Sequence, residues 1–284
     1  MRCVDVTAGT VEYEDTGGDG PVLVFAHGLL MDGREWRDVV ADLRRDHRCV
    51  LPTLPLGAHR RPMRPDADLS LRGLGRLLTE VVERLDLHDV TLCFNDWGGA
   101  QVMIDDGLTD RVGGVVLTSC EAFDNYPPGI PGRLAALSAR TPGALVMMRR
   151  AMLVRALRNL PITFGAMSKR GIPDDLIREW LEPLRDRGVR RDFRKYAGDV
   201  KRGRRDFVAA IDALASFERP VLVAWASEDR LMPVEHGRRL AATFPHATLV
   251  EIPDSYTLVP IDQPSALASA IREFVAKRMV EPSR

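Results

Sequence analysis

Short apolar runs recur along the first 120 residues and are separated by segments with helical spacing. Pro21–Ala26 is a continuous apolar run, which is typical of a strand buried on both faces. Alternating residues predict an earlier strand at Val11–Asp15. Further strands are predicted at Cys49–Leu54, Asp89–Phe94 and Val112–Thr118.

Helical segments lie between these runs, and the alternation resumes after residue 215. Trp36–Leu43 has helical spacing, and Ser70 can cap a helix whose apolar positions continue to residue 85. The later strands and helices are predicted at Pro220–Trp225, Val234–Phe244, Thr248–Ile252 and Pro264–Arg278. Alternating strands and helices imply right-handed crossovers, so we expect an α/β fold with a mostly parallel sheet flanked by helices.

Residues 121–214 interrupt this alternation. The segment contains no strand-like run, and proline and glycine divide it into helical pieces such as Ala144–Leu160 and Asp174–Arg187. We therefore predict an α/β core formed by residues 1–120 and 215–284, with residues 121–214 inserted as an all-helical cap, or lid. No internal repeat or low-complexity segment occurs.

The amino-acid composition limits the kinds of binding partner that we expect. The 40 basic and 40 acidic residues give zero net charge, which argues against a nucleic-acid or anionic-membrane partner. The first residues lack an apolar signal region, and no apolar run approaches membrane-spanning length. Four scattered cysteines show no metal-ligand spacing. We expect a cytoplasmic protein without metal or cofactor that binds a small molecule, and we leave a homodimer open.

One strand passes directly into a turn that suits a reactive side chain. After Phe94 come Asn95, Asp96, Trp97 and two glycines, and a helical segment then begins. A side chain at the tip of such a turn stands above the sheet, near the N–H groups of the helix start. Asp96 occupies the tip. Gly98 supplies the small residue that close packing needs after the tip, whereas Phe94 is large for the matching position before it.

The order of these parts resembles the α/β-hydrolase superfamily over essentially the whole chain. The matching features are His27-Gly28 after a strand, Asp96 at the turn, the helical insertion, and Trp225–Pro233 after a late strand. Asn95–Gly99 is similar to the branch with an aspartate nucleophile, the haloalkane dehalogenases and epoxide hydrolases. The resemblance implies that Asp96 attacks carbon and forms a covalent ester.

The resemblance also implies roles around Asp96. The backbone N–H groups of Leu29 and Trp97 would form the oxyanion hole, and His27 would brace the loop that carries Gly28 and Leu29. Dehalogenases often carry asparagine where Leu29 stands, and epoxide hydrolases usually carry an aromatic residue there. The Trp97 indole could donate to a leaving halide or could simply pack under the lid.

Ligands of such a sheet bind outside the carboxyl ends of the strands. Several candidate polar side chains directly follow predicted strands and belong to that edge: His27, His59, Asp96, Glu121, Asp229 and Thr257. Asp229 matches the acid that orients a catalytic histidine, and Glu121 occupies the alternative acid position of some dehalogenases.

The expected base histidine is missing. In the family it follows the last strand, where this chain has Tyr256 and Thr257. Threonine is no base near neutral pH. Three explanations remain open: His59 substitutes as the base, Asp96 performs acid or base chemistry without a histidine, or the protein binds a ligand without turnover.

The lid suggests the substrate class. Its Met-rich and Leu-rich stretches suit an adaptable apolar cavity. In epoxide hydrolases, lid tyrosines polarise the epoxide oxygen, and the resemblance makes Tyr126 at the start of this lid and Tyr196 within it candidates for that role. We therefore predict a hydrolase for a small apolar epoxide, alkyl halide or ester, with Asp96 as nucleophile.

Overall fold

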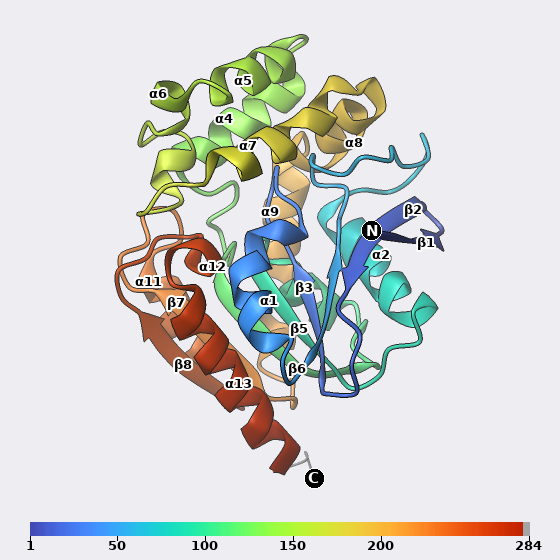
Figure 1. The fold of residues 1–284 in the computed structure, drawn as a ribbon, viewed down its shortest axis with the longest axis vertical. Coiled ribbons are helices and arrows are strands. Elements are labelled where there is room, and N and C mark those ends of the chain that lie inside the picture. The colour runs from blue at the N-terminus through green and yellow to red at the C-terminus, as the bar shows by residue number, and fades with distance from the viewer. Residues whose placement is uncertain (281–284) are drawn as a thin grey trace.

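The predicted strands assemble into one eight-stranded sheet in the computed structural model, which describes residues 1–280 (Figure 1). The strand order is β1-β2-β4-β3-β5-β6-β7-β8. β2 pairs antiparallel with β1 and β4, and the other neighbours are parallel. The predicted α/β fold class is confirmed. The strands are β1 Arg2–Val6, β2 Gly9–Asp15, β3 Val22–Ala26, β4 Arg48–Pro52, β5 Val90–Asp96, β6 Val112–Cys120, β7 Val221–Ala226 and β8 Ala247–Ile252.

The first strand was not predicted from the sequence. β1 lies at the edge of the sheet, and Val6 is its one buried residue, so its hydrophobic pattern is weak. β6 continues to Cys120, beyond the predicted Thr118, and stays buried throughout. The remaining strands lie within one or two residues of the predicted bounds.

Helices cover both faces of the sheet because successive strand residues point to opposite sides. Leu23 and Phe25 of β3 pack in the cluster that includes α1 and α13, whereas Val24 and Ala26 pack in the cluster that includes α2. α1 and α13 contact each other on the face turned to the viewer in Figure 1. The helices of this core are η1 Gly33–Trp36, α1 Arg37–Leu43, α2 Leu71–Arg84, α3 Gly99–Asp105, α11 Val234–Thr243, α12 Val259–Asp262 and α13 Pro264–Val280.

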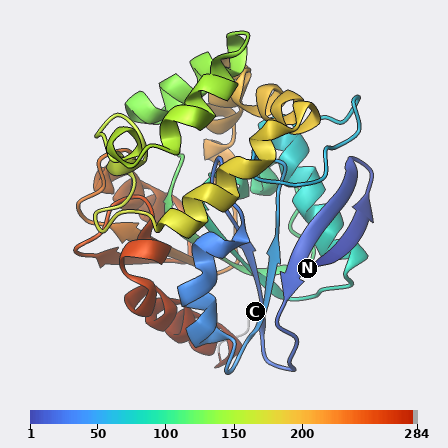
Figure 2. The same cartoon turned by 45° about the horizontal axis from the view of Figure 1, so that its top comes forward.

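Between β6 and β7 the described chain forms helices and loops without a strand. Figures 1 and 2 show α4 to α8, which we call the cap helices, above the end of the sheet. α9 and α10 contact α2 and α3 of the core, so the predicted lid boundary at residue 214 stays a prediction. The helices of this segment are α4 Gly129–Arg140, α5 Ala144–Met152, α6 Arg155–Arg158, η2 Phe164–Ala166, α7 Asp174–Leu181, η3 Glu182–Arg185, α8 Arg187–Ala197, α9 Val200–Ala209 and α10 Ile211–Leu214.

Two predicted long helices of this segment are each divided. Ala144–Leu160 forms α5 and the short α6, and Asp174–Arg187 forms α7 and η3 before α8 begins. Pro183 lies in η3, and a proline supplies no N–H to an α-helical hydrogen bond. Within residues 1–280 we find no helix with the length and apolar character that crossing a bilayer would require.

The turn between β5 and α3 is tightly packed. A side chain at Gly98 would collide with the Glu121 carbonyl oxygen and the Phe207 ring. Phe94, large for its position, is fully buried, and its ring centroid lies 5.7 Å from that of Trp97. The close approach of β6 to α3 therefore depends on the absence of a side chain at residue 98.

We predict that Gly98→Ala destabilises the fold by about 1–3 kcal/mol or more, because a backbone carbonyl cannot move aside as a flexible side chain can. Urea unfolding measures the loss. Gly75→Ala on α2 is the matched control, since its methyl group would meet the Met103 side chain. Equal effects of the two substitutions would contradict the special role of Gly98.

Candidate active site

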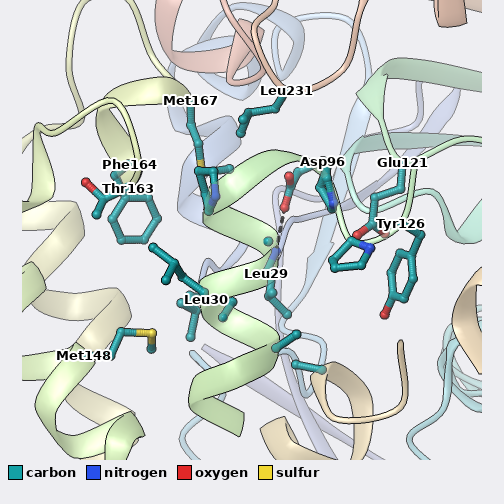
Figure 3. A pocket seen from close by; sticks show the side chains of 18 of the residues that line it. Leu29, Leu30, Asp96, Glu121, Tyr126, Met148, Thr163, Phe164, Met167 and Leu231 are labelled. Atoms are coloured by element: carbon teal, nitrogen blue, oxygen red, sulfur yellow. Dashed lines mark hydrogen bonds between the residues drawn. The ribbon is translucent and has the colours of Figure 1, made fainter. Parts of the chain in front are cut away.

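Asp96 ends β5 with a φ of 59°, in the left-handed region that costs a non-glycine residue about 1–3 kcal/mol. Its carboxylate lies against the loop after β3, where a side chain at Gly28 would collide with it. The Leu29 N–H donates to Asp96 Oδ2 at 2.9 Å (Figure 3). The Trp97 N–H, the other expected oxyanion-hole donor, donates to the Asn95 carbonyl at 2.6 Å.

The electrostatic state of Asp96 follows from its burial. Burial raises the pKa of Asp96 to about 6, the Leu29 N–H opposes this rise, and the negative charge of Asp229 adds to it. Asp96 is therefore ionised at neutral pH although its side chain is poorly solvated. A carboxylate in this state is available as a nucleophile.

Two buried side chains brace the loop that carries Leu29. His27 Nε2 accepts from the Leu54 N–H at 2.8 Å, so His27 Nδ1 donates to the Gly28 carbonyl at 2.9 Å. Burial lowers the pKa of His27 to about 4, so the ring is neutral. Glu35 Oε2 accepts from the Gly28 N–H at 3.1 Å. His27 thus supports the loop, as the resemblance implies.

A side-chain hydrogen bond joins Thr257 to Asp229. Thr257 Oγ1 donates to Asp229 Oδ1 at 2.8 Å, and the same oxygen accepts from the N–H groups of Leu231 and Met232 at 2.8 and 2.9 Å. Burial raises the pKa of Asp229 to about 6, against the opposing N–H groups and the Thr257 hydroxyl. Thr257 thus lies beside the acid, where the resemblance implies a histidine, and its hydroxyl supplies no base.

Glu121 faces the same pocket as Asp96. It follows β6, and the Tyr196 hydroxyl from α8 donates to Glu121 Oε2 at 3.2 Å. Burial raises the pKa of Glu121 well above its usual range, the Asp96 charge adds to the rise, and the Tyr196 hydroxyl and Gly98 N–H oppose it. Tyr126 packs edge-on against Tyr196 with ring centroids 6.4 Å apart. The protonated form of Glu121 is therefore favoured relative to that of an exposed glutamate.

The pocket itself is apolar. Leucine, methionine, proline and alanine side chains make up most of its lining, and part of it is open to solvent. Figure 3 shows Asp96, Glu121 and Tyr126 on one side of it, and Met148 and Phe164 on the other. The polar lining residues within the described chain are Asp96, Glu121, Tyr126, Thr163 and Tyr196. Asp96 and Glu121 therefore belong to the lining of one cavity.

Seven predicted site residues do not line this pocket within residues 1–280. Four of them, His27, Gly28, Asp229 and Thr257, make the contacts described above, and the other three are His59, Trp97 and Tyr256. His59 Nε2 donates to Asp192 Oδ2 at 3.3 Å and joins its loop to α8, so the structure does not support His59 as the substitute base. The Trp97 indole packs over Gly99 and is not part of the lining. The Arg230 guanidinium lies over the Tyr256 ring, 4.4 Å from the ring centroid, and Tyr256 is not part of the lining either.

Sequence reasoning missed two buried acids near the loop after β3. Glu35 carries the contact to Gly28 described above, and Asp32 accepts from the Trp180 indole of α7 at 3.0 Å. Both lie in a polar stretch before Trp36 that reads as an exposed helix start. The one signal of burial in the sequence was the position of Glu35, which is in line with the apolar positions of the helix that follows it.

A family model described as "Alpha/beta hydrolase family" matches residues 23–270. The chain belongs to the alpha/beta hydrolase family. Haloalkane dehalogenase 2 of Mycobacterium tuberculosis is 26% identical to this chain over 290 residues, which cover 96% of this chain and 93% of the relative. A cis-3-alkyl-4-alkyloxetan-2-one decarboxylase of Xanthomonas campestris is 26% identical over 301 residues, covering 96% and 95%.

Solved structures agree with this assignment of the fold. Haloalkane dehalogenase DbeA from Bradyrhizobium elkani superposes with a TM-score of 0.76 at 19% identity, covering 98% of each chain. Its identity to this alpha/beta hydrolase is low, so the likeness concerns the fold alone. The family and its relatives support a hydrolase and leave the reaction unspecified.

We predict that Asp96→Asn makes the protein more stable at neutral pH. Because the folded-state pKa is about 6 against an ordinary 3.8, ionising Asp96 costs the folded state stability, and this cost builds up as pH rises from about 4 to 6. A shift of this size corresponds to about 3 kcal/mol. Urea unfolding should show the gain near pH 7 and its disappearance near pH 4. The exposed Asp110→Asn is the control, and a gain that persists near pH 4 would contradict the electrostatic cause.

Proposed function

We propose that this protein hydrolyses a small apolar epoxide through a covalent ester on Asp96. The observation that carries the proposal is the shared pocket, in which Asp96 and Glu121 line one apolar cavity and burial raises the pKa of Glu121 well above its usual range. Nucleophilic opening of an epoxide needs both groups, because carbon is attacked while the ring oxygen acquires a proton.

The pocket lining favours an oxygen leaving group over a halide. Among the lining side chains of the described chain none carries an N–H group, and the Trp97 indole lies outside the lining. A departing halide would therefore meet hydroxyl groups and the Leu29 N–H, and no side-chain N–H of the kind that the Trp97 indole would supply. An epoxide oxygen can instead receive a proton from Glu121. The two relatives named above are a dehalogenase and an oxetanone decarboxylase, so alkyl halides and β-lactones belong in the test panel.

The first step opens the ring. An Asp96 carboxylate oxygen forms a bond to an epoxide carbon, the carbon–oxygen bond of the ring breaks, and the proton of Glu121 passes to the released oxygen. The products are a hydroxyalkyl ester of Asp96 and a Glu121 carboxylate. Glu121 is a positioned acid for this transfer, and its contact with Tyr196 fixes its orientation.

The second step hydrolyses the ester without a histidine. Glu121, now a carboxylate in an apolar site, takes a proton from water while the water oxygen attacks the Asp96 carbonyl carbon. The tetrahedral oxyanion collapses, the diol leaves with the remaining proton, and Asp96 and Glu121 return to their starting forms. The Leu29 N–H is the donor available to the oxyanion. One carboxyl acts as acid and then as base, as in retaining glycosidases.

Asp229 is the less suitable base. Three donors already occupy its Oδ1 atom, and Oδ2 is buried without a partner among residues 1–280. Neither Asp229 nor Thr257 belongs to the pocket lining in the described chain. Their contact instead holds the β8–α12 loop, whose Thr257 carbonyl accepts from Asn95 Nδ2 at 2.7 Å beside the Asp96 turn.

We predict that Glu121→Gln separates the two steps. The variant should open epoxides roughly 100- to 10,000-fold more slowly because the proton donor is lost. A small bromoalkane needs no proton on its leaving group, so the variant should still alkylate Asp96 and accumulate the ester. Intact-mass measurement after incubation with epoxides, bromoalkanes and β-lactones detects this adduct, and diol release measures turnover.

Asp96→Asn is the control that should abolish both adduct and product, and Asp229→Asn should retain adduct formation. Diol release by Asp96→Asn would contradict the nucleophile. An epoxide turnover unchanged in Glu121→Gln would contradict the acid–base role. Neither adduct nor product with any compound, together with binding that survives in Asp96→Asn, would favour the ligand-binding alternative.

The pH dependence should have two limbs. Activity on an epoxide should rise through about pH 6 as Asp96 ionises and fall at higher pH as Glu121 loses its proton. Alkylation of Asp96 by a bromoalkane should show the first limb alone, since it needs no acid. Rates measured across pH for both compounds test this difference, and a falling limb in the bromoalkane profile would contradict the assignment.

A further inference from the structure

The outer surface of the cap carries most of the exposed large apolar side chains. Of twelve such side chains in residues 1–280, eight lie between residues 130 and 162. Ile130, Leu134 and Leu137 recur at intervals of three and four along α4, so they form one outward stripe. Met147 on α5 and Leu157 on α6 are 73% and 41% exposed. We call the exposed side chains of residues 130–162 the cap patch.

The cap patch lies in a long segment that has basic residues and no acidic ones. Residues 125–173 contain eight arginines or lysines and no aspartate or glutamate, although the whole chain has zero net charge. Arg133, Arg150 and Arg155 are exposed, and none of them forms an ion pair with another residue of the described chain. The segment that carries the apolar stripe therefore also carries exposed basic side chains, and it has no acidic residue of its own to neutralise them.

The cap patch is continuous with the pocket. Leu134 and Ile162 are 39% and 42% exposed and also line the cavity that holds Asp96. Three of the cap helices, α4, α5 and α6, lie together at the top of the molecule in Figure 1. The exposed apolar surface and the entrance to the pocket thus share side chains.

We propose that the cap patch docks on a lipid bilayer surface rich in anionic headgroups. Apolar side chains of α4 to α6 would enter the boundary between headgroups and acyl chains, and Arg133, Arg150 and Arg155 would meet the phosphates. An apolar substrate dissolved in the lipid then reaches the pocket past Leu134 and Ile162. This docking goes beyond the proposed epoxide chemistry and does not depend on it.

Charge distinguishes two surfaces that could bind the cap patch, a second copy of this chain and an anionic lipid surface. A second copy presenting the same patch would bring arginines against arginines, which opposes association. An anionic lipid surface instead complements both the charge and the apolar stripe. The expectation of no membrane partner rested on net charge, which averages over a chain whose basic residues are unevenly placed.

Co-sedimentation with vesicles tests the proposal on the full chain. We expect binding to vesicles of equal phosphatidylcholine and phosphatidylglycerol, weak binding to pure phosphatidylcholine, and release by high salt. Arg150→Glu with Arg155→Glu should weaken binding by at least roughly tenfold. The matched control is Arg44→Glu with Arg45→Glu, two exposed residues before β4 at the opposite end of the strands.

A second variant tests the apolar contribution. Leu137→Ser with Leu157→Ser should also reduce binding to the mixed vesicles, although it leaves the charge unchanged. Asp96 alkylation by a water-soluble bromoalkane should be unchanged in all these variants, which separates a failure of docking from a failure of the proposed chemistry. Equal binding to both vesicle types, or equal loss in the Arg44 and Arg45 control, would overturn the proposal. A dimer that dissociates in the Leu137 and Leu157 variant without vesicle binding by the parent would overturn it too.

Discussion

The structure depends on holding an ionisable carboxylate out of water at the end of a parallel strand. Asp96 has a positive φ, its side chain is 6% exposed, and its charged form is disfavoured by burial. The surrounding chain offsets these costs with close backbone approaches. Gly28 and Gly98 leave the space that the turn requires, and Leu29 supplies one N–H to the carboxylate. The rest of the sheet provides the fixed strand ends on which this arrangement is built.

Three buried carboxyl groups lie near the turn. Their chemical environments differ because different hydrogen-bond donors contact each of them. Asp96 has a single backbone donor and faces the pocket, Glu121 is contacted by a lid hydroxyl in the same pocket, and one oxygen of Asp229 is occupied by three donors. Like charges close together cannot all ionise, so the environment divides the roles among them. Thr257 is then the partner that holds Asp229, and the proposed mechanism assigns the chemistry to Asp96 and Glu121, which share the pocket.

Much of the fold was predictable, because buried parallel strands produce continuous apolar runs that need no tertiary information. The position of Asp96 at a strand–turn–helix junction was equally visible in the sequence. The hydrogen-bond partners that folding brings together from distant parts of the chain were not visible in the sequence. His59 follows a strand as a catalytic base would, yet Asp192, 133 residues later, fixes its ring away from the pocket. Glu35 is buried because the Gly28 N–H reaches it. β1 has one buried residue and hence almost no pattern to recognise.

The absence of a histidine at residue 257 becomes intelligible when the proton requirement of the substrate is considered. A leaving halide needs no proton, so an enzyme acting on it needs a separate base for ester hydrolysis. An epoxide takes up a proton when it opens, and the carboxyl that gives this proton becomes the base for the next step. Such a carboxyl must be protonated at the start, which requires a dry pocket. The apolar cap over Glu121 satisfies that condition, and the same apolar surface continues outward to the cap patch.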